Sequence, residues 1–133
     1  MKDKIVDRKH ILVVDDEQNM RNTLEFILEA ANYKVTKAGN GRKALQKILQ
    51  AKNCGSPVDL IITDIMMPDM SGLELIDELN RQNINLPILV ITGYGNNKLR
   101  DKLLSRGCNE YLDKPIDDEK LLKKINILLE RKK

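Results

Sequence analysis

Five polar residues stand where apolar, strand-like runs of this sequence end, and their types suit phosphoryl chemistry. They are Asp15 and Asp16 after ILVV, Asp64 after DLIIT, Thr92 at the end of PILVIT, and Lys114 in YLDKP. The carboxyl ends of parallel strands meet at one edge of a sheet, and ligand sites form there. The sequence therefore predicts that three carboxylates, a hydroxyl and an ammonium group lie together.

The charges of this cluster favour a divalent cation. The three carboxylates carry −3 and Lys114 reduces the total to −2, so a divalent cation would neutralise the cluster. All of the candidate ligands are oxygens, which favours Mg²⁺ with waters and a backbone carbonyl completing its octahedron. A metal ion and a lysine can neutralise phosphoryl oxygens, a hydroxyl can donate to one, and a carboxylate can act as the nucleophile. The pattern indicates Mg²⁺-dependent phosphoryl transfer.

The elements that must position these groups alternate along the chain. Strand-length apolar runs lie at 10–14, 33–38, 59–64, 87–92 and 110–115. Amphipathic helical patterns lie at 19–31, 41–51, 72–81, 97–105 and 117–131. This alternation predicts one α/β domain, a parallel sheet with helices on both faces. In the helix 41–51 we expect Ala44, Leu45, Ile48 and Leu49 to face inward.

The stretch GNGRKA, Gly39 to Ala44, matches a dinucleotide-binding fingerprint, and Asp59 lies about 20 residues from its start. We do not interpret it as a nucleotide site, because that fingerprint belongs in the first strand–helix unit and here it is in the second. We instead expect Gly39-Asn40-Gly41 to form a tight turn that needs positive φ, with Ala44 as a small packed residue.

The ordered motifs LVVDDE, DLIITDIMMPDMSGLEL, PILVITG and YLDKP resemble the receiver domain of two-component response regulators. The resemblance extends from about Lys9 to Glu130. It implies a doubly wound (βα)5 domain of the flavodoxin-like class, with a five-stranded parallel sheet in the strand order 2-1-3-4-5. We expect residues 1–8 to be a lead segment and 9–131 the receiver domain, with no output domain in this chain.

The resemblance also implies a role for each residue of the cluster. Asp64 would be the phospho-acceptor and would bind Mg²⁺ with Asp16 and the backbone carbonyl of Met66. Asp15 would act on the metal through a water. Lys114 would pair with the acceptor carboxylate and then with its phosphoryl group, and the Lys114–Pro115 peptide bond would be cis.

Further residues would convert phosphorylation into a signal. Thr92 would hydrogen-bond a phosphoryl oxygen and draw its loop inward, and Tyr111 would turn from exposed to buried behind it. The altered surface would be the fourth helix, the fifth strand and the fifth helix. Met66 and Tyr94 would tune the lifetime of the phosphorylated state. Neither is an acid or an amide that could orient water, so we expect a long lifetime.

These roles imply a signalling switch rather than an enzyme, with a sensor histidine kinase or a phosphotransfer protein as partner. A homodimer through the switch surface is a further expectation. The N-terminus is too charged for a signal peptide and no apolar run is long enough to span a membrane, so we expect a cytoplasmic protein. The net charge is +3, but no reading helix or stacking aromatics accompany the basic residues, so we expect no nucleic-acid binding.

Several alternatives remain open within this class: a free-standing regulator, a phosphorelay shuttle, or a receiver from a longer regulator or hybrid kinase. A Mg²⁺-dependent phosphatase with an aspartate nucleophile is a different class. It would need a second acid two residues after the nucleophile, where this chain has Met66. A receiver-like module that is not phosphorylated is disfavoured because all five site residues are present.

Overall fold

Five parallel strands form the centre of the molecule in this computed structural model, which describes residues 8–67, 70–93 and 97–131. The strands are β1 (His10–Val14), β2 (Lys34–Ala38), β3 (Leu60–Thr63), β4 (Ile88–Thr92) and β5 (Glu110–Asp113). Their order in the sheet is β2-β1-β3-β4-β5, as the resemblance implied. The helices are α1 (Gln18–Ala30), α2 (Gly41–Asn53), α3 (Gly72–Arg81), α4 (Asn97–Ser105) and α5 (Asp118–Arg131).

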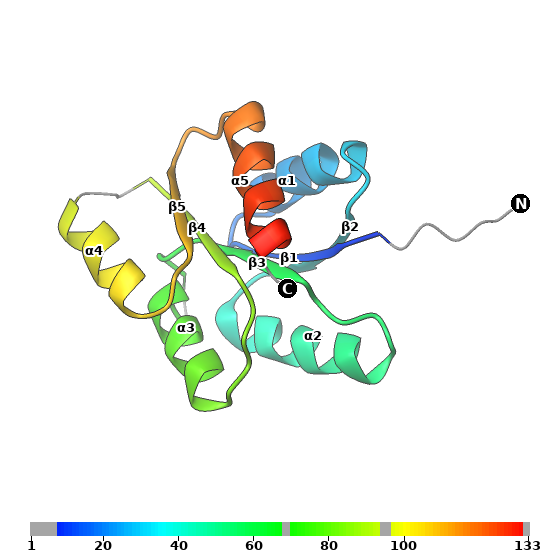
Figure 1. Cartoon of the computed structure of the whole chain (residues 1–133), viewed down its shortest axis with the longest axis horizontal. Helices are drawn as coiled ribbons and strands as arrows, with labels where there is room; N and C mark the ends of the chain where they lie inside the picture. Colours follow the sequence, from blue (N-terminus) through cyan, green and yellow to red (C-terminus); the bar gives the residue numbers. More distant parts are fainter. Residues whose placement is uncertain (1–7, 68–69, 94–96, 132–133) are drawn as a thin grey trace, which may run out of the picture.

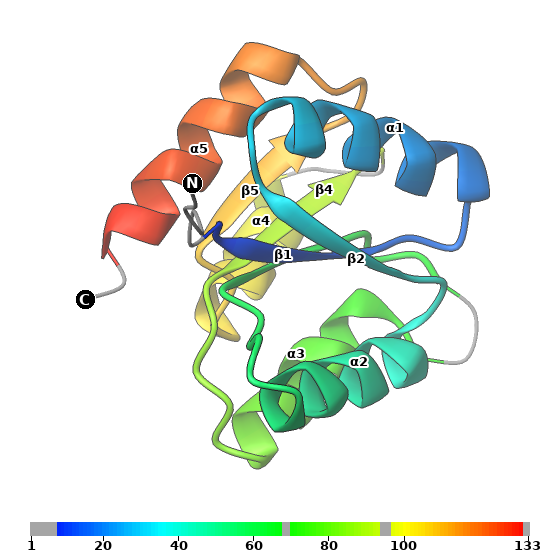
Figure 2. The same cartoon turned by 90° about the vertical axis from the view of Figure 1, so that its right-hand side faces the viewer.

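Each face of the sheet is covered by helices because each face is apolar. Along β1, Ile11 and Val13 join one buried cluster, and Leu12 and Val14 join the other, as the two-residue period of a strand requires. The first cluster packs against α1 and α5, and the second against α2, α3 and α4. Figures 1 and 2 show α1 and α5 on one side of the sheet and α2 and α3 on the other.

Helix α2 differs from the prediction in two respects. Leu49 is 46% exposed and faces solvent, whereas Ala44 and Ile48 are buried as expected. The sheet face accepts only one stripe of the helix, and Leu49 lies beyond it. The second difference is in the preceding turn, because neither Gly39 nor Gly41 has a positive φ. Gly41 instead has Met70 so close that a Cβ would overlap it.

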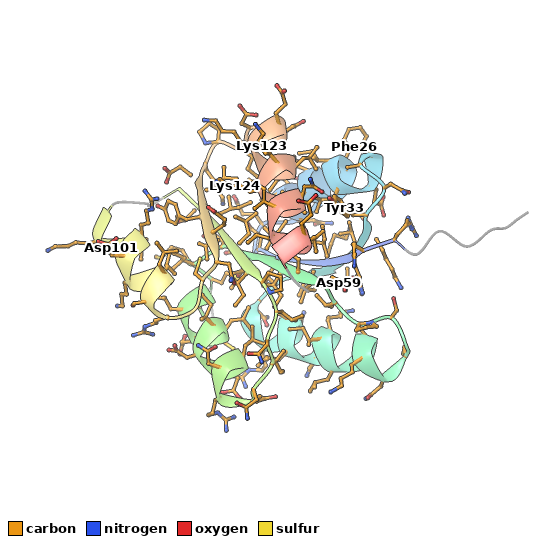
Figure 3. All side chains as sticks on the ribbon, viewed as in Figure 1. Phe26, Tyr33, Asp59, Asp101, Lys123 and Lys124 are labelled. Carbon is orange, nitrogen blue, oxygen red and sulfur yellow. The ribbon has the colours of Figure 1, made fainter. Side chains whose placement is uncertain are left out.

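Phe26 is the most exposed large apolar residue of the described chain. It is 76% exposed, and Figure 3 shows it on the outer side of α1. The inner side of the same helix contributes Leu24 and Leu28 to the core.

None of the helices in the described ranges is long and apolar enough to cross a membrane.

Candidate functional site

Parallel pairing brings the ends of β1 and β3 to one level, with β4 extending two residues further, and this places the predicted site residues at one edge of the sheet. Val14 is the register partner of Thr63 in β3, so the residues that follow them, Asp15 and Asp64, leave the sheet side by side. The Asp64 N–H donates to the Val14 carbonyl over 3.1 Å, which fixes the start of the loop. The Lys114 N–H donates to the Thr92 carbonyl over 2.9 Å and extends the ladder in the same way.

The carboxylate of Asp64 has one oxygen held by its own loop and one directed at the site. Oδ1 accepts from the backbone N–H groups of Ile65 at 2.6 Å and Met66 at 3.2 Å. Oδ2 accepts from Lys114 Nζ at 2.8 Å. Asp64 is only 7% exposed. The carboxylate is therefore fixed in orientation and presents Oδ2 toward the ammonium group.

Asp15 lies on the other side of the same ammonium group. Its Oδ2 is 3.5 Å from Lys114 Nζ, and its Oδ1 accepts from the Glu17 N–H over 2.9 Å. Burial raises the pKa of Asp15, and the charges of Asp64 and Asp16 act in the same direction, although the Glu17 N–H and Lys114 partly oppose them. Burial and the neighbouring acids therefore disfavour the ionised form of Asp15, and Lys114 compensates for this only in part.

The Lys114 ammonium bridges the two buried carboxylates. Burial alone lowers the pKa of Lys114, but its hydrogen bond to Asp64 and the charges of Asp15 and Asp64 outweigh burial and raise it. The Lys114–Pro115 bond is cis, as the resemblance implied. The lysine therefore remains protonated and acts as the internal cation of the site.

The remaining predicted residues occupy varied positions around this centre. Asp16 is exposed, and its charge acts on the buried carboxylate of Asp15. Thr92 is fully buried at the end of β4, and Met66 is 59% exposed beside the acceptor. Glu17 is exposed at the start of α1. Tyr94 lies outside the described residues.

Tyr111, the predicted switch residue, is half-buried on β5 and packs against the cluster under α2, α3 and α4. Its Oη is buried and has no hydrogen-bond partner, the one such side-chain atom in the described parts of the chain. Burial and the neighbouring Asp113 carboxylate raise the pKa of the phenol to about 12.

Sequence reasoning missed two contributors to the site. A Cβ on Gly72 would overlap the carbonyl oxygen of Asp64, so the start of α3 can approach the acceptor only as glycine. Arg21 Nη1 donates to the Asp15 carbonyl over 2.8 Å. The capping box of Ser71 and Glu74 marks the start of α3 in the sequence, but no sequence signal connects Arg21 with Asp15.

The donor set fits a small, hard cation. Two buried carboxylates converge, and all of the nearby donors apart from the lysine are oxygens. Within the described ranges no three acids are already close enough to enclose a metal. One or two carboxylates with several waters is nevertheless the usual coordination of Mg²⁺ in proteins. Asp15 and Asp64, with Asp16 at the rim, are the side chains that could hold it.

A doubly wound parallel sheet with two buried acids and a lysine at its carboxyl edge defines a signalling module of the two-component type. The family is shown directly, since residues 11–126 match the model of the response regulator receiver domain, and the chain belongs to this family.

Individual relatives agree with this assignment. The response regulator SaeR of Staphylococcus aureus (strain USA300) is 31% identical over 124 residues, which are 93% of this chain and 52% of SaeR. The chain thus spans about half the length of the curated relatives it matches.

Solved structures show the same fold. The chemotaxis protein CheY4 of Vibrio cholerae is 31% identical with a TM-score of 0.82, and the match covers 91% of this chain and 98% of CheY4. A CheY-like receiver domain protein of Methanospirillum hungatei JF-1 is 30% identical with a TM-score of 0.83, covering 93% and 95% of the two chains. The doubly wound, flavodoxin-like fold class is therefore confirmed.

Proposed function

We propose that Asp64 accepts a phosphoryl group from the phosphohistidine of a sensor histidine kinase or a phosphotransfer protein, in a Mg²⁺-dependent reaction. The observation that carries this proposal is the geometry of Asp64. One of its oxygens is tied to the backbone of its own loop, and the other is 2.8 Å from the Lys114 ammonium in a buried acidic site. Such a partner acts in the cytoplasm, where we place this domain.

The reaction follows from the two ends of that carboxylate. Oδ2 is the nucleophile, because Oδ1 is occupied by the N–H groups of Ile65 and Met66. As the O–P bond to Asp64 forms, the P–N bond of the donor breaks and the imidazole leaves. Mg²⁺, when bound, would neutralise the phosphoryl oxygens and the crowded acids.

The other residues of the site bind and orient the phosphoryl group. Lys114 is already within hydrogen-bond distance of Oδ2 and would transfer its hydrogen bond to a phosphoryl oxygen. Thr92 follows the apolar part of β4, and its hydroxyl would donate to another of these oxygens. Asp15 would help to hold the metal, and its position facing Lys114 supports this role.

The output surface of this proposal is formed by α4, β5 and α5. A groove of about 600 Å³ lies there, lined by residues that include Arg100, Tyr111, Asp113 and Lys124. Charges of both signs line it, so a second copy of the chain or another protein could pair with it. We propose that phosphorylation draws Thr92 inward, moves Tyr111 and thereby changes what this groove binds.

The phosphoryl-transfer proposal can be tested with a small-molecule donor. Intact mass spectrometry after incubation with phosphoramidate and Mg²⁺ is expected to show one added phosphoryl group on the wild-type chain and none on Asp64→Asn. Asp77→Asn is the matched control, because Asp77 is an exposed acid on α3 paired with Arg106. EDTA is expected to abolish the reaction. Undiminished phosphorylation of Asp64→Asn would show that the acceptor is another residue.

A further inference from the structure

The turn between β2 and α2, residues 39–41, contacts Arg21 of α1 on one side and Met70, in the connection between β3 and α3, on the other. It contains the two glycines whose spacing resembles a nucleotide-binding motif, and neither has the positive φ that would explain a glycine. An added Cβ on Gly41 would overlap Met70, and one on Gly39 would lie within van der Waals contact of the Arg21 guanidinium. Met70 lies in the connection that follows Asp64, and Arg21 donates a hydrogen bond to the backbone of Asp15.

On the first side, Arg21 connects the turn to Asp15. Its guanidinium donates from Nη1 to the Asp15 carbonyl over 2.8 Å. A Cβ on Gly39 would lie 3.4 Å from the same Nη1, which is ordinary van der Waals contact, so the guanidinium lies directly against the turn. The Asp15 N–H also donates to the Ala38 carbonyl over 3.1 Å. The backbone of Asp15 is therefore held on its N–H side by β2 and on its carbonyl side by Arg21.

On the second side, Gly41 contacts the connection between β3 and α3. A Cβ on buried Gly41 would lie 2.7 Å from Met70 Cγ and 2.9 Å from the Met70 carbonyl oxygen. A flexible methionine side chain could move away, but the backbone carbonyl could not move without shifting the connection. The Gly72 N–H closes this connection onto the Ile65 carbonyl over 3.0 Å, next to Asp64.

We propose that the β2–α2 turn is a brace that sets the separation of Asp15 and Asp64, with Arg21 as a positioning residue, and that it thereby determines the affinity of the site for Mg²⁺. This inference rests on the proposed function in one respect, that the site binds Mg²⁺. The turn itself supplies no ligand. It acts through the backbone of Asp15 on one side and the β3–α3 connection on the other.

Electrostatics and positioning predict opposite results for Arg21, which makes the inference testable. Arg21 is a half-exposed cation beside a cation site, so its charge alone would weaken Mg²⁺ binding slightly, and removing it would strengthen binding. If Arg21 positions Asp15, removing it would weaken binding. Loss of a partner that orients a metal ligand typically lowers affinity by about 10–100-fold.

The experiment compares Mg²⁺ dissociation constants, measured by isothermal titration calorimetry, for the wild-type chain and three variants. Arg21→Met and Gly41→Ala are each expected to raise the dissociation constant by about tenfold. Gly55→Ala is the control, since Gly55 has a φ of +80° and no atom within 4 Å of an added Cβ. It should lower the melting temperature in EDTA through backbone strain and leave the Mg²⁺ dissociation constant within about twofold. For Arg21→Met, the phosphorylation rate with phosphoramidate should need more Mg²⁺ for half-saturation but reach the wild-type maximum.

Each outcome decides a different question. Absence of Mg²⁺ binding by the wild-type chain would refute the proposed function itself. If the wild-type chain binds Mg²⁺ and Arg21→Met binds it equally or more tightly, Arg21 is not a positioning residue. An unchanged dissociation constant for Gly41→Ala would refute the second half of the brace. Equal weakening by Gly55→Ala would mean that general destabilisation, rather than position, explains the losses.

Discussion

Replacing Lys114 with methionine would remove the only cation that bridges Asp15 and Asp64 among the described residues, while keeping most of the side-chain volume. The lysine lies 2.8 Å from Asp64 Oδ2 and 3.5 Å from Asp15 Oδ2, and the three side chains are only 20%, 8% and 4% exposed. Removing one partner of a buried ion pair leaves an uncompensated buried charge and costs about 3–5 kcal/mol. Because Lys114 retains some contact with solvent, we expect the lower end, about 3 kcal/mol of unfolding free energy in EDTA.

The assay is urea denaturation followed by circular dichroism, with and without Mg²⁺. Most of the loss in Lys114→Met should be recovered when Mg²⁺ is added, because the metal replaces the missing positive charge. The matched control is Lys124→Met, since Lys124 forms an ion pair of 2.9 Å with Glu110 but the two side chains are 32% and 31% exposed. That exposed pair should contribute about 0.5 kcal/mol. The reasoning would be refuted if Lys114→Met were as stable as the wild-type chain in EDTA.

The pH dependence of this difference has a defined sign. Although burial alone would lower the pKa of Lys114, its contacts with Asp64 and Asp15 raise that pKa above the ordinary value of 10.5. The contribution of protonated Lys114 to stability is therefore fully present below pH 10.5, and it is lost as the pH rises through the folded-state pKa of Lys114. Burial raises the pKa of Asp15 above 3.8, so ionising Asp15 lowers stability as the pH rises through its folded-state value. In EDTA at pH 7, Asp15→Asn should therefore be more stable than the wild-type chain.

Three further predictions concern other parts of the chain. A maleimide reagent at pH 8 should label exposed Cys54 rapidly and leave folded Cys108 unreacted, because burial raises the pKa of the Cys108 thiol to about 11; labelling of both at equal rates would contradict this. In urea denaturation, Phe26→Ser should change stability by less than about 0.5 kcal/mol because Phe26 is 76% exposed. Leu24→Ala on the inner face should cost about 2–5 kcal/mol, and similar losses for the two variants would refute the assigned faces. The phosphorylated form should decay over minutes or longer, because Met66 has no group to orient water; a half-life of seconds, measured by mass spectrometry after removal of the donor, would be incompatible with that prediction.

Most of the fold and the main site residues followed from the sequence because both depend on local patterns. Apolar runs and amphipathic periods are local, and they predicted β1, α3 and α4 with the bounds that the structure has. A parallel sheet then places the residues after its strands at one edge, so Asp15, Asp64 and Lys114 could be expected to meet. Their contact over 2.8 and 3.5 Å agrees with that expectation.

The tertiary structure alone decided how each residue at this edge is used. Asp15 is buried against Lys114 while its neighbour Asp16 is exposed, a difference set by the direction in which the chain leaves β1. Gly41 is explained by the close approach of Met70, and Gly39 lies against the guanidinium of Arg21, both from segments far away in the sequence. Such contacts between distant segments leave no periodic trace, because they depend on how packed elements meet rather than on the spacing of residues within one element.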